Sequence, residues 1–131
     1  MRVLVVDTNI VSYLLKRHSF GEAYRYLLQD NLLSISFMTV AELHEGAVRA
    51  KWGTAKLAHL DRTMENYTVV QSSKALSLLW AEIRAARWRQ PIGVADAWVA
   101  ATAIACDCPL VTHNPKDFGG IPDLKVLTVT L

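Results

Sequence analysis

The sequence predicts an α/β protein of three layers, in which helices cover both faces of a central, mainly parallel sheet of four or five strands. Short apolar runs of strand length alternate with longer segments of helical periodicity, which is the pattern of a doubly wound sheet. The apolar runs are continuous and rich in β-branched residues, as expected for strands covered on both faces. A length of 131 residues suits one core, so we expect a single domain over residues 1–131.

The expected elements begin with an apolar strand close to the N-terminus. Strands are expected at Val3–Val6, Leu33–Ile35, Thr68–Val70, Leu110–Val111 and Val126–Val129. Helices are expected where apolar residues recur at helical spacing, at Ile10–Lys16, Phe20–Gln29, Val40–Ala50, Ala55–Asn66, Lys74–Arg89 and Val94–Cys106. The last helix carries small residues on the face that includes Asp96, so we expect it to approach the sheet closely.

The composition excludes several classes of protein. With 52% hydrophobic and 20% charged residues, the chain is too apolar for intrinsic disorder. A net charge of +2 excludes a uniformly basic nucleic-acid coat but allows a local basic patch. Cys106 and Cys108 are too few for a disulfide framework, which favours a reduced, cytoplasmic setting. The N-terminal apolar run is too short for a signal peptide, and the later apolar stretch 97–106 falls short of the ~20 residues of a spanning helix, so we expect no membrane association.

Acidic residues occur where the strands of such a sheet end, at the edge where ligands bind in this class of fold. Asp7 directly follows the first strand, Glu42 lies one helical turn beyond the second, Asp96 lies in the first turn of the last helix, and Asp117 follows the fourth strand. We expect these four carboxylates to meet at one edge of the sheet. Carboxylates that lie close together repel one another, and a divalent cation reverses this repulsion. Oxygen ligands of this kind suit one or two Mg²⁺ or Mn²⁺ ions.

Each acid also has an explanation that needs no metal. Asp7 is placed to cap the following helix, and Thr39–Glu42 matches a capping box. Asp96 is placed to interact with a helix dipole, and Asp117 with its neighbours reads as an ordinary turn. These explanations account for the acids one by one. They do not predict that the elements carrying the acids all point at the same edge of the sheet.

Five short segments follow one another along nearly the whole chain. They are Val6-Asp7-Thr8-Asn9, Ala41-Glu42-Leu43 with Gly46, Pro91-Ile92-Gly93, Asp96-Ala97-Trp98-Val99-Ala100-Ala101, and Leu110-Val111-Thr112-His113-Asn114 with Asp117-Phe118. In order and spacing they resemble a PIN domain, and the small size resembles the VapC-type toxins of bacterial and archaeal toxin–antitoxin pairs. The resemblance implies a metal-dependent endoribonuclease, acting as a homodimer and held inactive by a small antitoxin protein.

The resemblance also implies roles for individual residues. Catalysis and metal binding are expected at Asp7, Glu42 and Asp96. At the fourth position many members of the family have an acid, whereas this chain has Asn114 and places its acid three residues later. Asp117, Asn114 or the Thr112 hydroxyl is therefore expected to complete the site. Trp98 stands where the family usually has a smaller aliphatic residue, and we expect it to pack on a neighbouring helix or subunit.

The expected reaction is in-line attack of water on an RNA phosphodiester, leaving the 5′-phosphate and 3′-hydroxyl products that the resemblance implies. Thr8 and Asn9 are expected to orient the carboxylates or to contact the substrate. Arg84, Arg87 and Arg89, interleaved with Trp88, suit contacts to an RNA backbone and its bases. Basic residues at a helix C-terminus are also favoured by the helix dipole, whatever the function.

Other classes of protein share the broad architecture. A receiver-like signalling module needs a phosphate-accepting aspartate after the middle strand, where this chain has Gln71-Ser72-Ser73. A phosphatase with an aspartyl nucleophile needs a second acid where Asn9 stands. The main alternative is a PIN-like module that binds RNA or protein in a regulatory role and has lost catalysis, which the retained acids disfavour.

Overall fold

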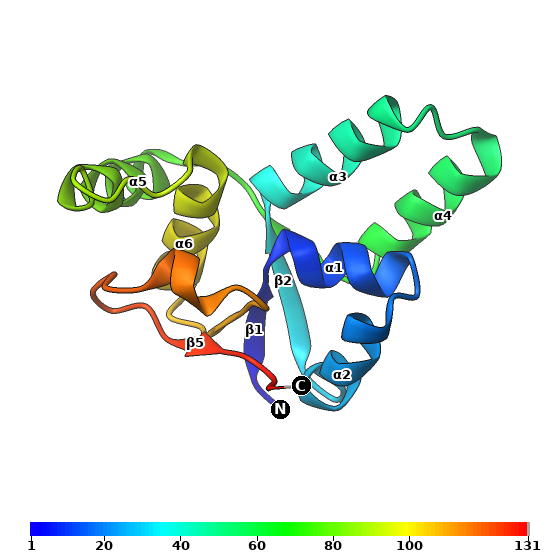
Figure 1. The fold of residues 1–131 in the computed structure, drawn as a ribbon, viewed down its shortest axis with the longest axis horizontal. Helices are drawn as coiled ribbons and strands as arrows, with labels where there is room; N and C mark the ends of the chain where they lie inside the picture. Colours follow the sequence, from blue (N-terminus) through cyan, green and yellow to red (C-terminus); the bar gives the residue numbers. More distant parts are fainter. Residues whose placement is uncertain (131) are drawn as a thin grey trace.

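The computed structural model describes residues 1–130 and has one sheet of five parallel strands (Figure 1). The strands are β1 (Val3–Val6), β2 (Leu32–Ser36), β3 (Thr68–Val70), β4 (Leu110–Val111) and β5 (Val126–Leu127). Their order in the sheet is β3-β2-β1-β4-β5, and every neighbouring pair is parallel. The chain therefore moves outward from β1 in one direction and later returns to the other side of β1. The point where the order reverses lies between β1 and β4, and it is where ligands bind in open α/β sheets.

Helices cover both faces of the sheet, as the sequence predicts. They are α1 (Thr8–Leu15), α2 (Ser19–Leu28), α3 (Phe37–Arg49), α4 (Thr54–Met64), α5 (Lys74–Ala86) and α6 (Val94–Cys106), followed by a short 3₁₀ helix, η1 (Pro115–Phe118). Figure 1 shows α1 to α4 on one side of the strands and α5 and α6 on the other. Within residues 1–130, no helix is long and apolar enough to cross a lipid bilayer.

Two hydrophobic cores lie on the two faces of the sheet, and β1 belongs to both. Leu4 and Val6 point into the core with α1, α2, α3 and α4, whereas Val5 points into the core with α5 and α6. This alternation follows from the period of two along a strand. Because all three side chains are fully buried, β1 needs a continuous apolar sequence, which is the pattern found there.

Most predicted bounds lie within two residues of those in the structure, including β5, which ends at Leu127 rather than Val129, and two helices differ by three residues at one end. Helix α3 begins at Phe37 rather than Val40, because the Ser36 hydroxyl accepts a hydrogen bond from the amide of Met38 (3.0 Å) and caps the helix. The capping-box explanation of Thr39–Glu42 is therefore wrong, since Thr39 is buried inside the helix. Helix α5 ends at Ala86 rather than Arg89, and the residues around Asp117 form η1 rather than a simple turn.

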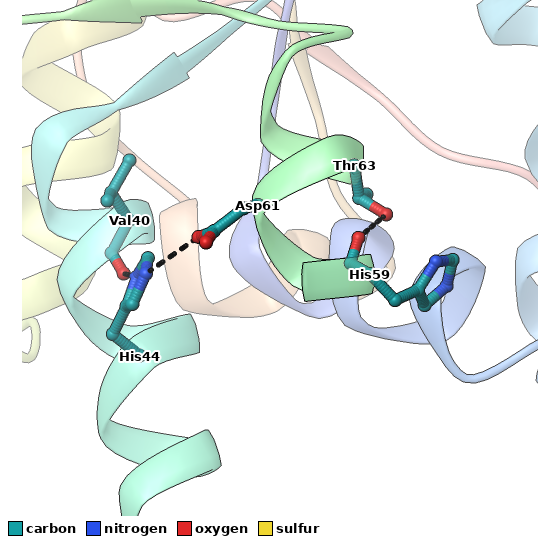
Figure 2. A network of polar contacts seen from close by, with 5 residues as sticks. All are labelled: Val40, His44, His59, Asp61 and Thr63. Carbon is teal, nitrogen blue, oxygen red and sulfur yellow. Dashed lines mark hydrogen bonds and ion pairs between the residues drawn. The ribbon is translucent and has the colours of Figure 1, made fainter. Parts of the chain in front are cut away.

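Helices α3 and α4 form a hairpin, and a polar contact joins the two helices (Figure 2). The Nδ1 atom of His44 donates to the carbonyl oxygen of Val40 (2.8 Å), so its Nε2 atom faces α4 and lies 3.8 Å from the Asp61 carboxylate. On α4 the Thr63 hydroxyl donates to the carbonyl of His59 (2.9 Å). The contact between α3 and α4 matters for the site because α3 carries Glu42.

A buried tyrosine joins α2 to the ends of β4 and β5. The hydroxyl of Tyr24, which is fully buried, lies 2.6 Å from Nδ1 of His113, 3.1 Å from the Thr128 hydroxyl and 3.3 Å from the Thr112 carbonyl. It also accepts a hydrogen bond from the amide of Val129 (3.2 Å). One phenol oxygen thus satisfies polar groups of the segment that follows β4.

Removing this hydroxyl should destabilise the protein. Tyr24→Phe leaves the buried carbonyl of Thr112 and several part-buried polar groups without this partner, so we expect the free energy of unfolding to fall by about 1–3 kcal/mol. Urea unfolding followed by circular dichroism measures this change. Tyr26→Phe is the matched control, because Tyr26 lies on the same helix and is 89% exposed. An equal loss of stability in both variants would contradict the role of the Tyr24 hydroxyl.

Candidate active site

The candidate site lies where the strand order reverses, at the carboxyl ends of β1 and β4. The pairing of Val6 with Val111 places the next residue of each strand, Asp7 and Thr112, side by side. Glu42 arrives on α3 directly after β2, Asp96 lies in the first turn of α6, and Asp117 lies in η1 after β4. The fold therefore brings acids from distant parts of the sequence to one edge of the sheet.

Asp7 is a buried carboxylate with both oxygens engaged. One oxygen accepts from the amide of Thr8 (2.8 Å) and caps α1, and the other accepts from the Thr112 hydroxyl (2.7 Å). The capping explanation is therefore correct for Asp7 but accounts for only one of its two oxygens. Burial raises the pKa of Asp7 above its ordinary value, the charges of Glu42 and Asp117 add to this rise, and the two hydrogen bonds oppose it.

Two threonines orient Glu42. The Thr8 hydroxyl donates to the Glu42 carboxylate (2.7 Å) and lies 2.9 Å from the hydroxyl of Thr39. Since Thr8 has one hydroxyl proton, Thr39 donates to Thr8 and Thr8 donates to Glu42. The first turn of α1 is thereby linked to the interior of α3.

Asp96 shows most clearly that the acids form one electrostatic cluster. Burial raises its pKa to about 6, and the charges of Asp7, Asp117 and Glu42 contribute to this rise in that order. The positive charge of Arg87 opposes it. Asp96 therefore lies close enough to the other three acids for their charges to disfavour its ionisation.

The other predicted residues occupy different places around the acids. Thr112 is fully buried and also accepts from the amide of Asn114 (3.1 Å), so Asn114 contributes its main chain to this network. Asn9 is exposed and, together with Thr8 and Glu42, lines a pocket of about 430 Å³ between α1 and α3. Asp117 is exposed, and its charge raises the pKa of both Asp7 and Asp96.

One face of α5 holds the segments that carry Asp96 and Asp117. Three side chains at helical spacing donate to main-chain carbonyls there. The Trp80 indole donates to Val94 (3.2 Å), Arg84 to Ile92, and Arg87 to Asp117 (2.8 Å). Residues 92–94 lead into α6, so these bonds set the position of its first turn. Sequence reasoning missed this role because a carbonyl acceptor leaves no signature in the amino-acid sequence.

Trp98 packs inside the subunit, on the side of α6 that faces α5. Its ring stacks on Trp80 with 5.1 Å between ring centroids and an interplanar angle of 20°, and it meets Phe37 edge-on at 5.2 Å. The expectation that Trp98 packs on a neighbouring helix is confirmed. The guanidinium of Arg84 lies 5.6 Å from the centre of the Trp80 ring, which adds a cation–π contact to this stack.

The donor set fits a hard divalent cation. All four acids offer oxygen atoms, the acids repel one another, and two of them have raised pKa values. Across residues 1–130, no three His, Cys, Asp or Glu side chains converge as closely as metal ligands do. Ionised carboxylates repel one another, and a bound cation would offset that repulsion.

The comparisons with known proteins identify the family of this chain. The pattern of the PIN domain family matches residues 4–123. The chain belongs to the PIN domain family. It is 32% identical to ribonuclease VapC1 of Haemophilus influenzae over 128 residues, which cover 94% of this chain and 95% of the relative. It is 27% identical to the tRNA(fMet)-specific endonuclease VapC of Shigella flexneri, over 95% and 96% of the two chains.

The fold of this PIN domain is also that of solved structures. A chain in the crystal structure of VapBC2 from Rickettsia felis, bound to a DNA fragment from their promoter, superimposes with a TM-score of 0.84 and 27% identity. The match covers 98% of this chain and 99% of that one. The predicted fold class, with a parallel sheet between two layers of helices, is confirmed.

Neutralising Asp96 should stabilise the protein when no metal is present. Its pKa is raised from 3.8 to about 6 in the folded state, so the folded protein loses stability as pH rises from about 4 to about 6. Asp96→Asn removes this loss. Because the carboxyl is half-buried and solvent screens it, we expect a gain of only about 1 kcal/mol at pH 7 in EDTA.

Thermal unfolding between pH 4 and pH 7 measures this gain. The advantage of Asp96→Asn should vanish toward pH 4, where the wild-type carboxyl is protonated. Glu82→Gln on the exposed side of α5 is the control and should show no comparable dependence on pH. A variant that is less stable than the wild type at pH 7 would mean that Asp96 acts as a dipole partner and not as a member of a repelling cluster.

Proposed function

We propose that this PIN domain is a metal-dependent endoribonuclease and the toxin of a toxin–antitoxin pair. The observation that supports the proposal is electrostatic: the charges of Asp7, Asp117 and Glu42 all raise the pKa of Asp96, which lies near the point where the strand order reverses. Relatives named as VapC ribonucleases, which match along almost the whole chain, support the same activity.

The four acids would hold one or two Mg²⁺ or Mn²⁺ ions. A bound ion of this kind would lower the pKa of a coordinated water and neutralise charge on the phosphate oxygens. Thr112 and the amide of Thr8 hold Asp7, and the Thr8 hydroxyl holds Glu42, so these hydrogen bonds fix the orientation of both carboxylates. Asn9, exposed beside Glu42, is placed to contact the RNA strand.

Several partners and properties belong to this proposal. The substrate is RNA, and the inhibitor is a cognate antitoxin protein, since one solved relative is a toxin–antitoxin complex from Klebsiella pneumoniae. We propose that the chain works as a homodimer in the cytoplasm, where its two free cysteines would stay reduced. The alternative of an inactive binding module would not need the paired threonine–carboxylate contacts described above.

Cleavage should require both the metal and the acids. The wild-type chain, freed of any antitoxin, should cleave a labelled RNA with Mg²⁺ or Mn²⁺ and stop in excess EDTA. Asp7→Asn and Asp96→Asn should each lower the rate at least about 100-fold, because each removes a charged ligand. Glu82→Gln is the matched control and should keep the wild-type rate. Undiminished cleavage by both aspartate variants would end the proposal.

The Thr112 hydroxyl should matter through Asp7. Thr112→Val keeps the size of this fully buried side chain but removes the donor to Asp7, so we expect Mn²⁺ affinity to fall about 10- to 100-fold. Thr112→Ser keeps the hydroxyl and should retain most of the affinity. Titration calorimetry with Mn²⁺ measures both variants. Equal affinity in Thr112→Val and the wild type would mean that Asp7 is held without this bond.

A further inference from the structure

A pocket of about 410 Å³ lies beside the acids, between the end of α5 and the loop that follows η1. Residues 86–90 form one wall and residues 119–120 form the other. Its volume is near the lower end of the range of about 300–1,000 Å³ for ligand sites, which suits a small ligand. The wall at Gly120 is bare main chain, because its φ of +74° lies in the left-handed region that favours glycine.

The pocket pairs a large aromatic ring with positive charge. Trp88 is 68% exposed, so most of its indole faces solvent and not the protein core. The guanidinium of Arg89 lies 4.8 Å from the centre of the Trp88 ring, which holds the two side chains together. Arg87 also lines the pocket, whereas no acidic residue does. An aromatic face next to cations is the combination that binds single-stranded nucleic acid, by base stacking and phosphate contact.

The pocket adjoins the candidate active site through Arg87. The guanidinium of Arg87 donates to the carbonyl of Asp117 (2.8 Å), and its charge lowers the pKa of Asp96. The opposite wall begins at Gly119, two residues after Asp117. A ligand in the pocket would therefore lie next to the acids and share η1 as a boundary with them.

Arg84, Arg87 and Arg89, which the sequence predicts to contact RNA together, differ in their contacts within the protein. Arg84 and Arg87 donate to main-chain carbonyls of the site, and both are partly buried. Arg89 is exposed, and its contact in the structure is with Trp88. Arg89 is thus the member of the group whose guanidinium is available to a phosphate.

We propose that this pocket binds one nucleotide of the RNA strand next to the cleaved phosphodiester, with its base stacked on Trp88 and its phosphate against Arg89. The proposal rests on the proposed ribonuclease function and adds to it a subsite outside the acidic cluster. Because every base has a stackable face, this subsite adds affinity without selecting a base.

Binding and cleavage by the full-length chain test this proposal separately. Binding is measured by fluorescence anisotropy of a short, fluorescein-labelled single-stranded RNA of mixed sequence in EDTA. Trp88→Ala should weaken binding about five-fold or more, and Trp88→Phe should restore most of it. With Mn²⁺ present, Trp88→Ala should raise KM and leave kcat within about two-fold. Tyr26→Ala, which removes an exposed aromatic side chain on α2, is the matched control and should bind like the wild type.

The dependence of binding on salt tests Arg89. Arg89→Ala should reduce the slope of log affinity against log salt concentration by about 0.7, the value for one phosphate contact to a single strand. Arg62→Ala, an exposed arginine on α4, is the control and should keep the wild-type slope. Unchanged RNA affinity in both Trp88→Ala and Arg89→Ala overturns the subsite, and loss of antitoxin binding in the same variants would assign the pocket to protein instead. Absence of cleavage by the wild type would overturn the ribonuclease function, while the anisotropy result would still decide whether the pocket binds RNA.

Discussion

The repulsion among four carboxylates is the constraint on which the rest of this structure depends. Asp7 and Asp96 have raised pKa values because they are withdrawn from water and lie near other acids. Such an arrangement destabilises the folded chain on its own, so the packing around it must hold the acids in place. Two buried cores, one on each face of the sheet, provide that packing, and β1 connects them because its side chains enter both.

Hydrogen bonds to the acids and to their neighbouring main chain complete the support, and they divide into two groups. Asp7 and Glu42 are held through side-chain hydroxyls, from Thr112 and Thr8. Asp117 is held through its own carbonyl by Arg87, at the end of α5, and Asp96 is held indirectly, through bonds from α5 to the main chain just before it. The first group fixes the carboxylate oxygens themselves, whereas the second fixes the backbone and leaves the side chains free to adjust. We infer that ligand geometry is set more tightly on the side of β1 than on the side of α6.

Periodicity and composition were sufficient to predict the architecture. The alternation of strands and helices can be recognised from local sequence, and that alternation is typical of a doubly wound sheet. Helix α6 has the predicted bounds, since it starts after Gly93 and ends just before Asp107, which adopts the left-handed conformation common at helix ends. Asp7, Glu42 and Asp117 were predicted from the positions of strand ends, and Asp96 from the first turn of the last helix, because topology brings these places to one edge of the sheet. The start of α3 was misplaced because Ser36 and Thr39 are both good capping residues, and only the tertiary contact of Thr39 with Thr8 selects between them. The roles of Arg84 and Arg87 were not predictable, because their acceptors are carbonyl oxygens that every residue possesses.

The site lies between the two cores, so a ligand bound there would contact elements from both faces of the sheet. Asp7 and Glu42 extend from elements packed in the core of α1 to α4, and Asp96 extends from the core of α5 and α6. A cation held by acids of both groups would join the two faces of the sheet, and its binding free energy would stabilise their relative position. The pocket at Trp88 belongs entirely to the side of α5 and η1. An RNA strand that occupies this pocket and reaches Asp7 would therefore contact both faces of the sheet, as the cation would. The two ligands should favour the same relative position of the two faces. Each should then bind more tightly when the other is present.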